Sequence, residues 1–134
     1  MKILVIDGQG GSLGAQIIKA VVGRFPDISL TAVGTNAMAT SAMLKAGAGN
    51  AATGENPVIV ACRTADVIVG PVGIVVADSL NGEITPKMAL TVGQADAVRI
   101  LIPMNKCDIV VAGVKNVSVN ALIEEAVDKI GEML

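Results

Sequence analysis

Asp7 and the glycine-rich run that follows it are the residues near the N-terminus best suited to chemistry. The run reads Asp7-Gly8-Gln9-Gly10-Gly11-Ser12-Leu13-Gly14 and satisfies two glycine spacings, G-x-G-x-x-x-G and G-x-x-G-x-x-G. Glycines at such spacings let the chain turn tightly, let phosphate oxygens approach backbone amides, and aim the positive end of the next helix at the ligand. We therefore predict an anion-binding loop for a nucleotide or another phosphorylated ligand. The predicted contacts come from Gly8, Gln9, Gly10, Gly11, Ser12 and Gly14. In the alternative interpretation, these glycines only shape a tight connection.

A second group of candidate ligand-binding residues, Gly34-Thr35-Asn36, follows the second predicted strand. Domains that bind NAD place an acid here for the ribose, and those that bind NADP place an arginine nearby for the 2′-phosphate. No Asp or Glu lies between Asp27 and Glu55, and no arginine adjoins the segment. The cofactor therefore stays open between NAD(P), another nucleotide and a small phosphorylated metabolite. Thr35 and Asn36 either hydrogen-bond this ligand or cap the following helix.

Three residues are candidates for catalysis: Asp7, Lys87 and Lys106. Asp7 either accepts hydrogen bonds from the loop amides or acts as a Mg²⁺ ligand or general base. Lys87 falls in the first turn of a predicted helix, where the dipole opposes a cation, so either a ligand offsets this cost or the side chain is solvated. Glu83 and Asn105 are further polar groups that we would test for a substrate role. The chain has no His and no Tyr, which excludes a Ser-His-Asp triad and a histidine-ligated zinc.

The composition predicts one α/β domain spanning residues 1–134. Hydrophobic residues make up 52% of the chain, with one Phe and no Trp or Tyr, so the core must consist of aliphatic side chains and methionine. A net charge of −2 and the lack of aromatic stacking platforms argue against a nucleic-acid partner. The longest apolar run, Val67 to Ala77, is too short to span a membrane, and we expect a cytoplasmic protein. Cys62 and Cys107 have no CxxC spacing, so we predict small buried side chains and no metal site.

Strands and helices are expected to alternate along the chain. Apolar runs predict strands at 2–6, 28–33, 49–53, 66–70 and 99–102, with a further edge strand at 108–114. Helical periodicity and capping residues predict helices at 13–22 (ended by Gly23), 37–46, 57–64, 86–95 and from Ser118 or Asn120 onward. For the third helix we take Asn56 as the cap and Pro57 as the first residue, with a strand at 58–61 as the alternative.

This alternation predicts an open, mostly parallel, doubly wound sheet of five to six strands with helices on both faces. Right-handed crossovers suggest a Rossmann-like fold with a strand order near 3-2-1-4-5. In such sheets the ligand binds beyond the carboxyl ends of the strands. The glycine loop, Gly34-Thr35-Asn36 and the segment 103–106 should therefore meet at one edge.

Several motifs together give the chain a resemblance that extends over most of its length. They are IDGQGGSLG, GTNAMATSAMLKAGA, ATGEN, ADVIVGP, GEITPKMA and ILIPMNKC. In these the chain resembles a small bacterial family known only as a domain of unknown function. The resemblance implies a Rossmann-like fold and carries no activity or substrate.

Two functional hypotheses from different classes follow. In the first, the chain is a nucleotide- or NAD(P)-binding protein, with or without catalysis, that holds a phosphorylated ligand at the glycine loop. In the second, it is a non-catalytic oligomeric sensor or assembly subunit. A mean hydropathy of +0.67 suggests apolar surface beyond a single core, so both hypotheses include a homo-oligomer, a dimer being the first expectation.

Overall fold

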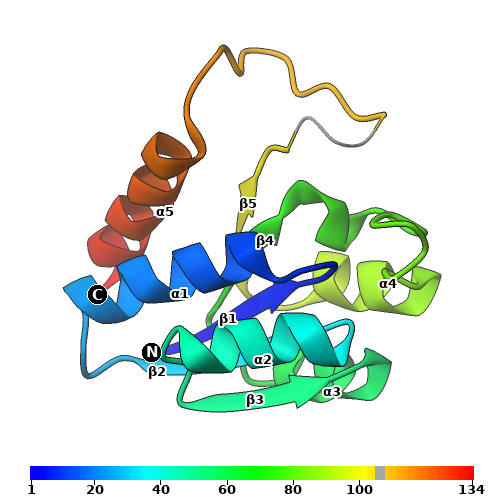
Figure 1. Cartoon of the computed structure of the whole chain (residues 1–134), viewed down its shortest axis with the longest axis horizontal. Helices are drawn as coiled ribbons and strands as arrows, with labels where there is room; N and C mark the ends of the chain where they lie inside the picture. The colour runs from blue at the N-terminus through cyan, green and yellow to red at the C-terminus, as the bar shows by residue number, and fades with distance from the viewer. Residues whose placement is uncertain (105–107) are drawn as a thin grey trace.

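Five parallel strands form one sheet in the computed structural model, which describes residues 1–104 and 108–134 (Figure 1). The order is β3-β2-β1-β4-β5, which confirms the predicted order. The strands are β1 (Lys2–Asp7), β2 (Ser29–Gly34), β3 (Asn50–Thr53), β4 (Val67–Pro71) and β5 (Val98–Ile102). The central β1 reads as a continuous apolar run because both of its faces are covered.

Helices cover both faces of the sheet, as predicted for a doubly wound fold. One face carries α1 (Ser12–Arg24), α2 (Ala37–Lys45) and α5 (Val119–Met133), whose buried aliphatic residues pack on alternate residues of the strands. The other carries α3 (Glu55–Cys62) and α4 (Pro86–Gln94), with a 3₁₀ turn η1 (Val72–Val75) after β4. The two hydrophobic clusters thus lie on opposite sides of one sheet.

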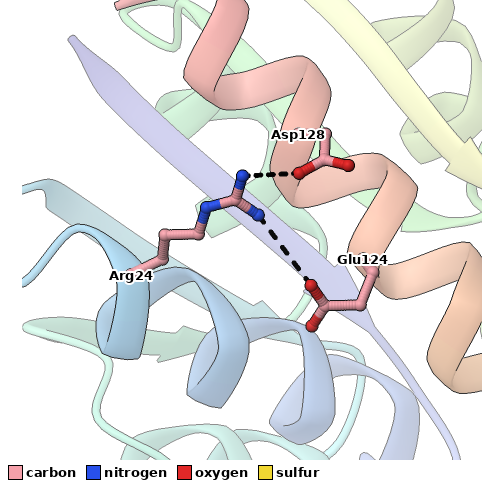
Figure 2. Close-up of polar contacts among 3 residues, drawn as sticks. All are labelled: Arg24, Glu124 and Asp128. Carbon is pink, nitrogen blue, oxygen red and sulfur yellow. Dashed lines mark ion pairs between the residues drawn. The ribbon is translucent and has the colours of Figure 1, made fainter.

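An ion-pair cluster joins the end of α1 to α5. The Nη2 atom of Arg24 lies 2.5 Å from Oδ1 of Asp128, and its Nη1 atom lies 3.8 Å from Oε2 of Glu124 (Figure 2). The guanidinium also lies over the ring of Phe25, 5.8 Å from its centroid. The three charged side chains are exposed, so their ion pairs contribute little to stability.

The predicted edge strand at 108–114 is wrong. Residues 108–117 form no helix or strand, with a turn at 112–113 and bends at 108 and 116, and in Figure 1 this segment extends away from the sheet. Val110 is 94% exposed, and a turn closes from the amide of Val114 to the carbonyl of Val111, with Gly113 at φ +88°. A β-branched run becomes a strand only where it finds a pairing partner, and these residues find none in the described chain. Asn105, Lys106 and Cys107 lie outside the described residues.

Two helix boundaries also differ from the prediction. Helix α1 continues through Gly23 to Arg24 and is closed by the amide of Phe25, which bonds to the carbonyl of Val21. Helix α3 begins at Glu55 after Gly54, which has a φ of +109°, so Asn56 is not the cap and Pro57 lies in the first turn. The alternative strand at 58–61 is wrong as well. Within the first turn a proline is tolerated because the amide there has no helical partner anyway.

The remaining capping predictions hold. Thr85 accepts a hydrogen bond from the amide of Met88 at the start of α4, and Ser118 accepts one from Ala121 at the start of α5.

Cys62 is buried, and burial raises the pKa of its thiol to about 11. Across the described ranges, no helix combines the length and hydrophobicity needed to cross a membrane.

Candidate functional site

The glycine loop joins the carboxyl end of β1 to the start of α1. Gly11 is the residue before the helix and has a left-handed conformation, with φ +75° and ψ 10°. A Cβ atom at Gly11 would lie 2.7 Å from Cα of Ala39 in α2, so this position has no room for a side chain. The amide of Gly11 bonds to the carbonyl of Gly8 at 2.9 Å, which closes the turn. The loop conformation therefore depends on glycine for both its torsion angles and its packing.

Asp7 binds the loop from inside the molecule. Its side chain is 5% exposed; Oδ1 accepts from the amide of Gly8 at 2.8 Å, and Oδ2 accepts from the amide of Gly14 at 2.7 Å. Burial raises the pKa of this carboxyl, the two amide bonds lower it, and the charge of Glu83 raises it, with a net rise. These contacts bear out the interpretation in which Asp7 accepts hydrogen bonds from the loop amides.

The absence of a side chain at Gly14 makes the contact with Asp7 possible. A Cβ atom at Gly14 would lie 2.8 Å from Cβ of Asp7 and 2.6 Å from Sδ of Met43. The first turn of α1 can therefore lie directly against β1 and α2. This is close helix-to-strand packing of the kind that the third glycine of such motifs provides.

Three loop amides have no hydrogen-bond partner in the part of the chain that the structure describes: those of Gly10, Ser12 and Leu13. The first amides of a helix have no partner within it, and a ligand can take that place. All three residues line a cavity of about 270 Å³ at the carboxyl edge of the sheet. Its other walls include Pro71, Gly73, Ser79, Leu80, Met104 and Val119.

The segment after β2 reaches the same edge. Asn36 caps α2, because its Oδ1 accepts from the amide of Ala39 at 2.9 Å, which confirms the capping interpretation. Its Nδ2 also donates to the carbonyl of Gln9 at 2.9 Å. Thr35 adjoins the loop more directly, since its amide bonds to the carbonyl of Asp7 at 3.0 Å.

Glu83 reaches these residues from the connection between β4 and α4. Its Oε1 atom accepts from Oγ1 of Thr35 at 2.5 Å, from Nδ2 of Asn36 at 2.7 Å and from the amide of Gln9 at 2.9 Å. Desolvation raises the pKa of Glu83, but the hydrogen bonds from Thr35, Gln9 and Asn36 outweigh it and lower the pKa below its usual value. The sequence indicates Glu83 as a polar candidate but gives no sign of these three partners.

The other catalytic candidates are not brought to this cavity. Lys87 is exposed in the first turn of α4 and does not line the cavity; its carbonyl accepts a hydrogen bond from Thr91. Lys106 lies outside the described residues, so its predicted role is untested. Among residues 1–104 and 108–134, no group of His, Cys, Asp or Glu side chains is arranged to hold a metal ion. The structure thus assembles Asp7, the loop, Thr35, Asn36 and Glu83, and leaves Lys87 apart.

The sequence pattern of nearly the whole chain identifies its family. A family described as Domain of unknown function (DUF3842) matches residues 2–134, nearly the whole chain. The chain belongs to the DUF3842 family. The family confirms the resemblance seen in the motifs and brings no activity with it. No protein with a curated description matches the DUF3842 chain.

One solved structure is similar to the DUF3842 chain in outline. It is the crystal structure of a dodecameric FMN-dependent Ubix-like decarboxylase from Escherichia coli O157:H7, with 17% sequence identity and a TM-score of 0.47. The match covers 98% of the DUF3842 chain and 77% of the decarboxylase chain. At this distance, the likeness says nothing about ligand, reaction or assembly.

Proposed function

We propose that this protein binds a small phosphorylated molecule, such as a mononucleotide, at the glycine loop between β1 and α1. The observation that carries the proposal is a set of three amides, at Gly10, Ser12 and Leu13, that have no partner among residues 1–104 and 108–134 and belong to residues that line a cavity. They lie at the N-terminus of a 13-residue helix, where the dipole favours negative charge. A phosphate group on these amides would supply their missing acceptors.

The size and lining of the cavity favour a small ligand. Its volume of about 270 Å³ is just below the range of roughly 300–1,000 Å³ that ligand pockets usually have. The described residues that line the cavity include no Lys or Arg, so within this part of the chain the backbone amides provide the attraction for the phosphate. Pro71, Leu80, Met104 and Val119 offer apolar contacts for the rest of the ligand. We therefore favour a mononucleotide or phosphorylated metabolite over NAD(P).

The same geometry supports a positioning role for Asp7 in place of a catalytic one. Both of its carboxylate oxygens already accept loop amides, and the side chain is buried behind the loop. A base that abstracts a proton from substrate needs an oxygen within reach of it. We propose that the protein is first of all a binding protein, and that Asp7 holds the loop in its binding conformation.

Isothermal titration with AMP, set against NAD and NADP, tests the proposal. The key variant is Gly10→Asp, because a Cβ atom at Gly10 meets nothing within 4 Å and the new carboxylate would repel the phosphate. Gly93→Asp is the matched control, since Gly93 in α4 also has open space around it. We expect Gly10→Asp to weaken AMP binding by at least about ten-fold and Gly93→Asp to leave it unchanged. Equal affinity in the two variants, or no binding of AMP by the wild-type protein, would contradict the proposal.

We further propose that the protein forms a homodimer in solution. Exposed large hydrophobic side chains occur on both helices of one face of the sheet, Val60 in α3 and Leu90 in α4. Together with the high mean hydropathy, they support an apolar contact between copies of the chain. Size-exclusion chromatography with light scattering should give twice the mass of one chain at micromolar concentration, and a monomer would refute the dimer.

A further inference from the structure

The carboxylate of Glu83 sits among donors that come from two other connections of the sheet. We use the name three-donor cup for the amide of Gln9, the hydroxyl of Thr35 and the Nδ2 group of Asn36, which all donate to Oε1 of Glu83. These donors lie just beyond the carboxyl ends of β1 and β2. Such donors suit a phosphate or ribose oxygen as well as a carboxylate, so a group of the protein occupies a place that a ligand would otherwise take.

The three-donor cup adjoins the proposed ligand cavity. Gln9 belongs to both, and Gly8 lies between them: a Cβ atom at Gly8 would be 2.5 Å from Oγ1 of Thr35 and 3.1 Å from Oε1 of Glu83. Leu80, which lines the cavity, has its Cδ1 atom 3.0 Å from the same point. A ligand that extended from the Gly10 amide past Gly8 toward β2 would therefore meet the carboxylate of Glu83.

The segment that carries Glu83 is a tightly closed turn. Asp78, Leu80 and Asn81 have φ angles of 65°, 55° and 57°, a left-handed conformation that Asp and Asn tolerate but that costs a residue such as Leu80 about 1–2 kcal/mol. The turn is closed by a 2.7 Å bond from the amide of Asp78 to the carbonyl of Ile84, and Ile84 is buried in the core. Backbone strain of this kind persists only where the surroundings enforce it. The turn therefore holds Glu83 in a fixed position at the carboxyl edge of the sheet.

We propose that Glu83 determines the specificity of the site: it fills the three-donor cup with the protein's own negative charge and restricts binding to ligands with one anionic group. The inference rests on the proposed function and adds the ligand class. Monophosphate esters bind on the Gly10 side of the loop. Diphosphates and dinucleotides, which carry a second anionic group, are rejected because that group would have to displace or approach the carboxylate.

The ratio of the dissociation constants for inorganic phosphate and inorganic pyrophosphate tests the inference. We compare the wild-type protein with three variants. Glu83→Ser empties the three-donor cup, Glu83→Gln keeps an acceptor there but removes the charge, and Asp78→Asn removes an exposed charge from the same turn. Asparagine tolerates the left-handed conformation at position 78, so this control keeps the turn.

We expect the wild-type protein to bind pyrophosphate no more tightly than phosphate. Glu83→Ser should shift the ratio toward pyrophosphate by at least about ten-fold. Glu83→Gln, which removes the charge but keeps an acceptor in the three-donor cup, should shift the ratio in the same direction by a smaller factor, and Asp78→Asn should shift it by less than about three-fold. Phosphate binding by the wild-type protein together with an unchanged ratio in Glu83→Ser would overturn the inference and leave the proposed function standing. A wild-type protein that binds pyrophosphate ten-fold more tightly than phosphate would by itself overturn the inference. If no form bound phosphate, the proposed function would fail and the inference with it.

Discussion

Replacing Asp7 by asparagine should lower the stability of the protein because it breaks one of the two bonds that hold the glycine loop. In the wild-type protein, both oxygens accept an amide, from Gly8 at 2.8 Å and from Gly14 at 2.7 Å. Asparagine offers one oxygen and one NH₂ group, so one of these amides faces another donor. The side chain is 5% exposed, so water has little access to the amide that loses its acceptor.

The magnitude follows from these contacts. An unsatisfied buried donor costs about 1–3 kcal/mol, and hydrogen bonds to a charged acceptor contribute about 1.5–3 kcal/mol each. Relief of the buried charge acts in the opposite direction and offsets part of the loss. We therefore expect the free energy of unfolding of Asp7→Asn at pH 7 to fall by about 1–3 kcal/mol. For a chain of this size, this corresponds to a Tm lower by roughly 3–12 °C.

Thermal and urea unfolding of the wild-type protein, Asp7→Asn and the exposed control Asp27→Asn measures this loss. The control should change the free energy of unfolding by less than about 0.5 kcal/mol. A Tm of Asp7→Asn equal to or above that of the wild-type protein would refute the reasoning, since relief of the buried charge would then match or exceed the cost of leaving one loop amide without an acceptor.

The pH dependence gives a second check on Asp7. Because the pKa of Asp7 in the folded protein lies above its usual value, protonation favours the folded state. The contribution of this group to stability is complete below the unfolded value of 3.8 and is lost as the pH rises through the raised pKa. The stability difference between the wild-type protein and Asp7→Asn should therefore be largest in acid and narrow as the pH rises. A difference that widens with rising pH would mean that the amide bonds outweigh burial.

Three further predictions concern the loop, its acid neighbour and the helix contact. Gly11→Ala should lower the free energy of unfolding by about 2–4 kcal/mol, because Gly11 has a left-handed conformation and the new Cβ atom would meet the backbone of α2. In the same urea unfolding experiment, Gly10→Ala should stay within about 1 kcal/mol of the wild-type protein. Equal losses in the two variants would contradict the loop geometry. The pKa of Glu83 is lower in the folded protein than its unfolded value of 4.5, so the contribution of this carboxylate to stability is complete above pH 4.5. This contribution is lost as the pH falls through the pKa of the folded state. In a series of Tm values measured against pH, Glu83→Gln should not show this loss in acid. Arg24→Gln should cost less than about 1 kcal/mol, and the loss should shrink in 1 M salt; a larger, salt-independent loss would show that the cluster in Figure 2 contributes more than exposed ion pairs usually do.

The fold was predictable because its signals are local and agree with one another. The apolar run of β1, the helical stripe of α1 and the Thr85-Pro86 cap each lie within one element. Alternation of such elements leaves few topologies open, and the strand order follows from the rule for right-handed crossovers. The prediction of a strand at 108–114 is wrong because a strand forms only beside a neighbouring strand. The residues of the segment itself do not indicate whether such a neighbour is present.

In the candidate site too, the contacts between residues close in the sequence were predictable, and those between distant residues were not. The turn of the glycine loop and its contact with Asp7 involve residues no more than seven positions apart, and the spacing of Gly8, Gly11 and Gly14 predicts them. Glu83 is 48 positions from Thr35 and 74 from Gln9. Its placement depends on left-handed torsions at Asp78, Leu80 and Asn81, of which only Asn81, before a glycine, carries a recognisable turn signal.

The way in which the loop amides are shared explains how two acidic side chains can lie beside the proposed anion site. Two carboxylates of the protein take three of them: Asp7 takes those of Gly8 and Gly14, and Glu83 takes that of Gln9. These bonds hold the loop in one conformation, and within the described chain the amides of Gly10, Ser12 and Leu13 have no acceptor. The two negative charges that order the loop also oppose any anion that approaches it. Phosphate affinity should consequently be modest, and specificity should come from where the carboxylates lie more than from the number of donors that remain.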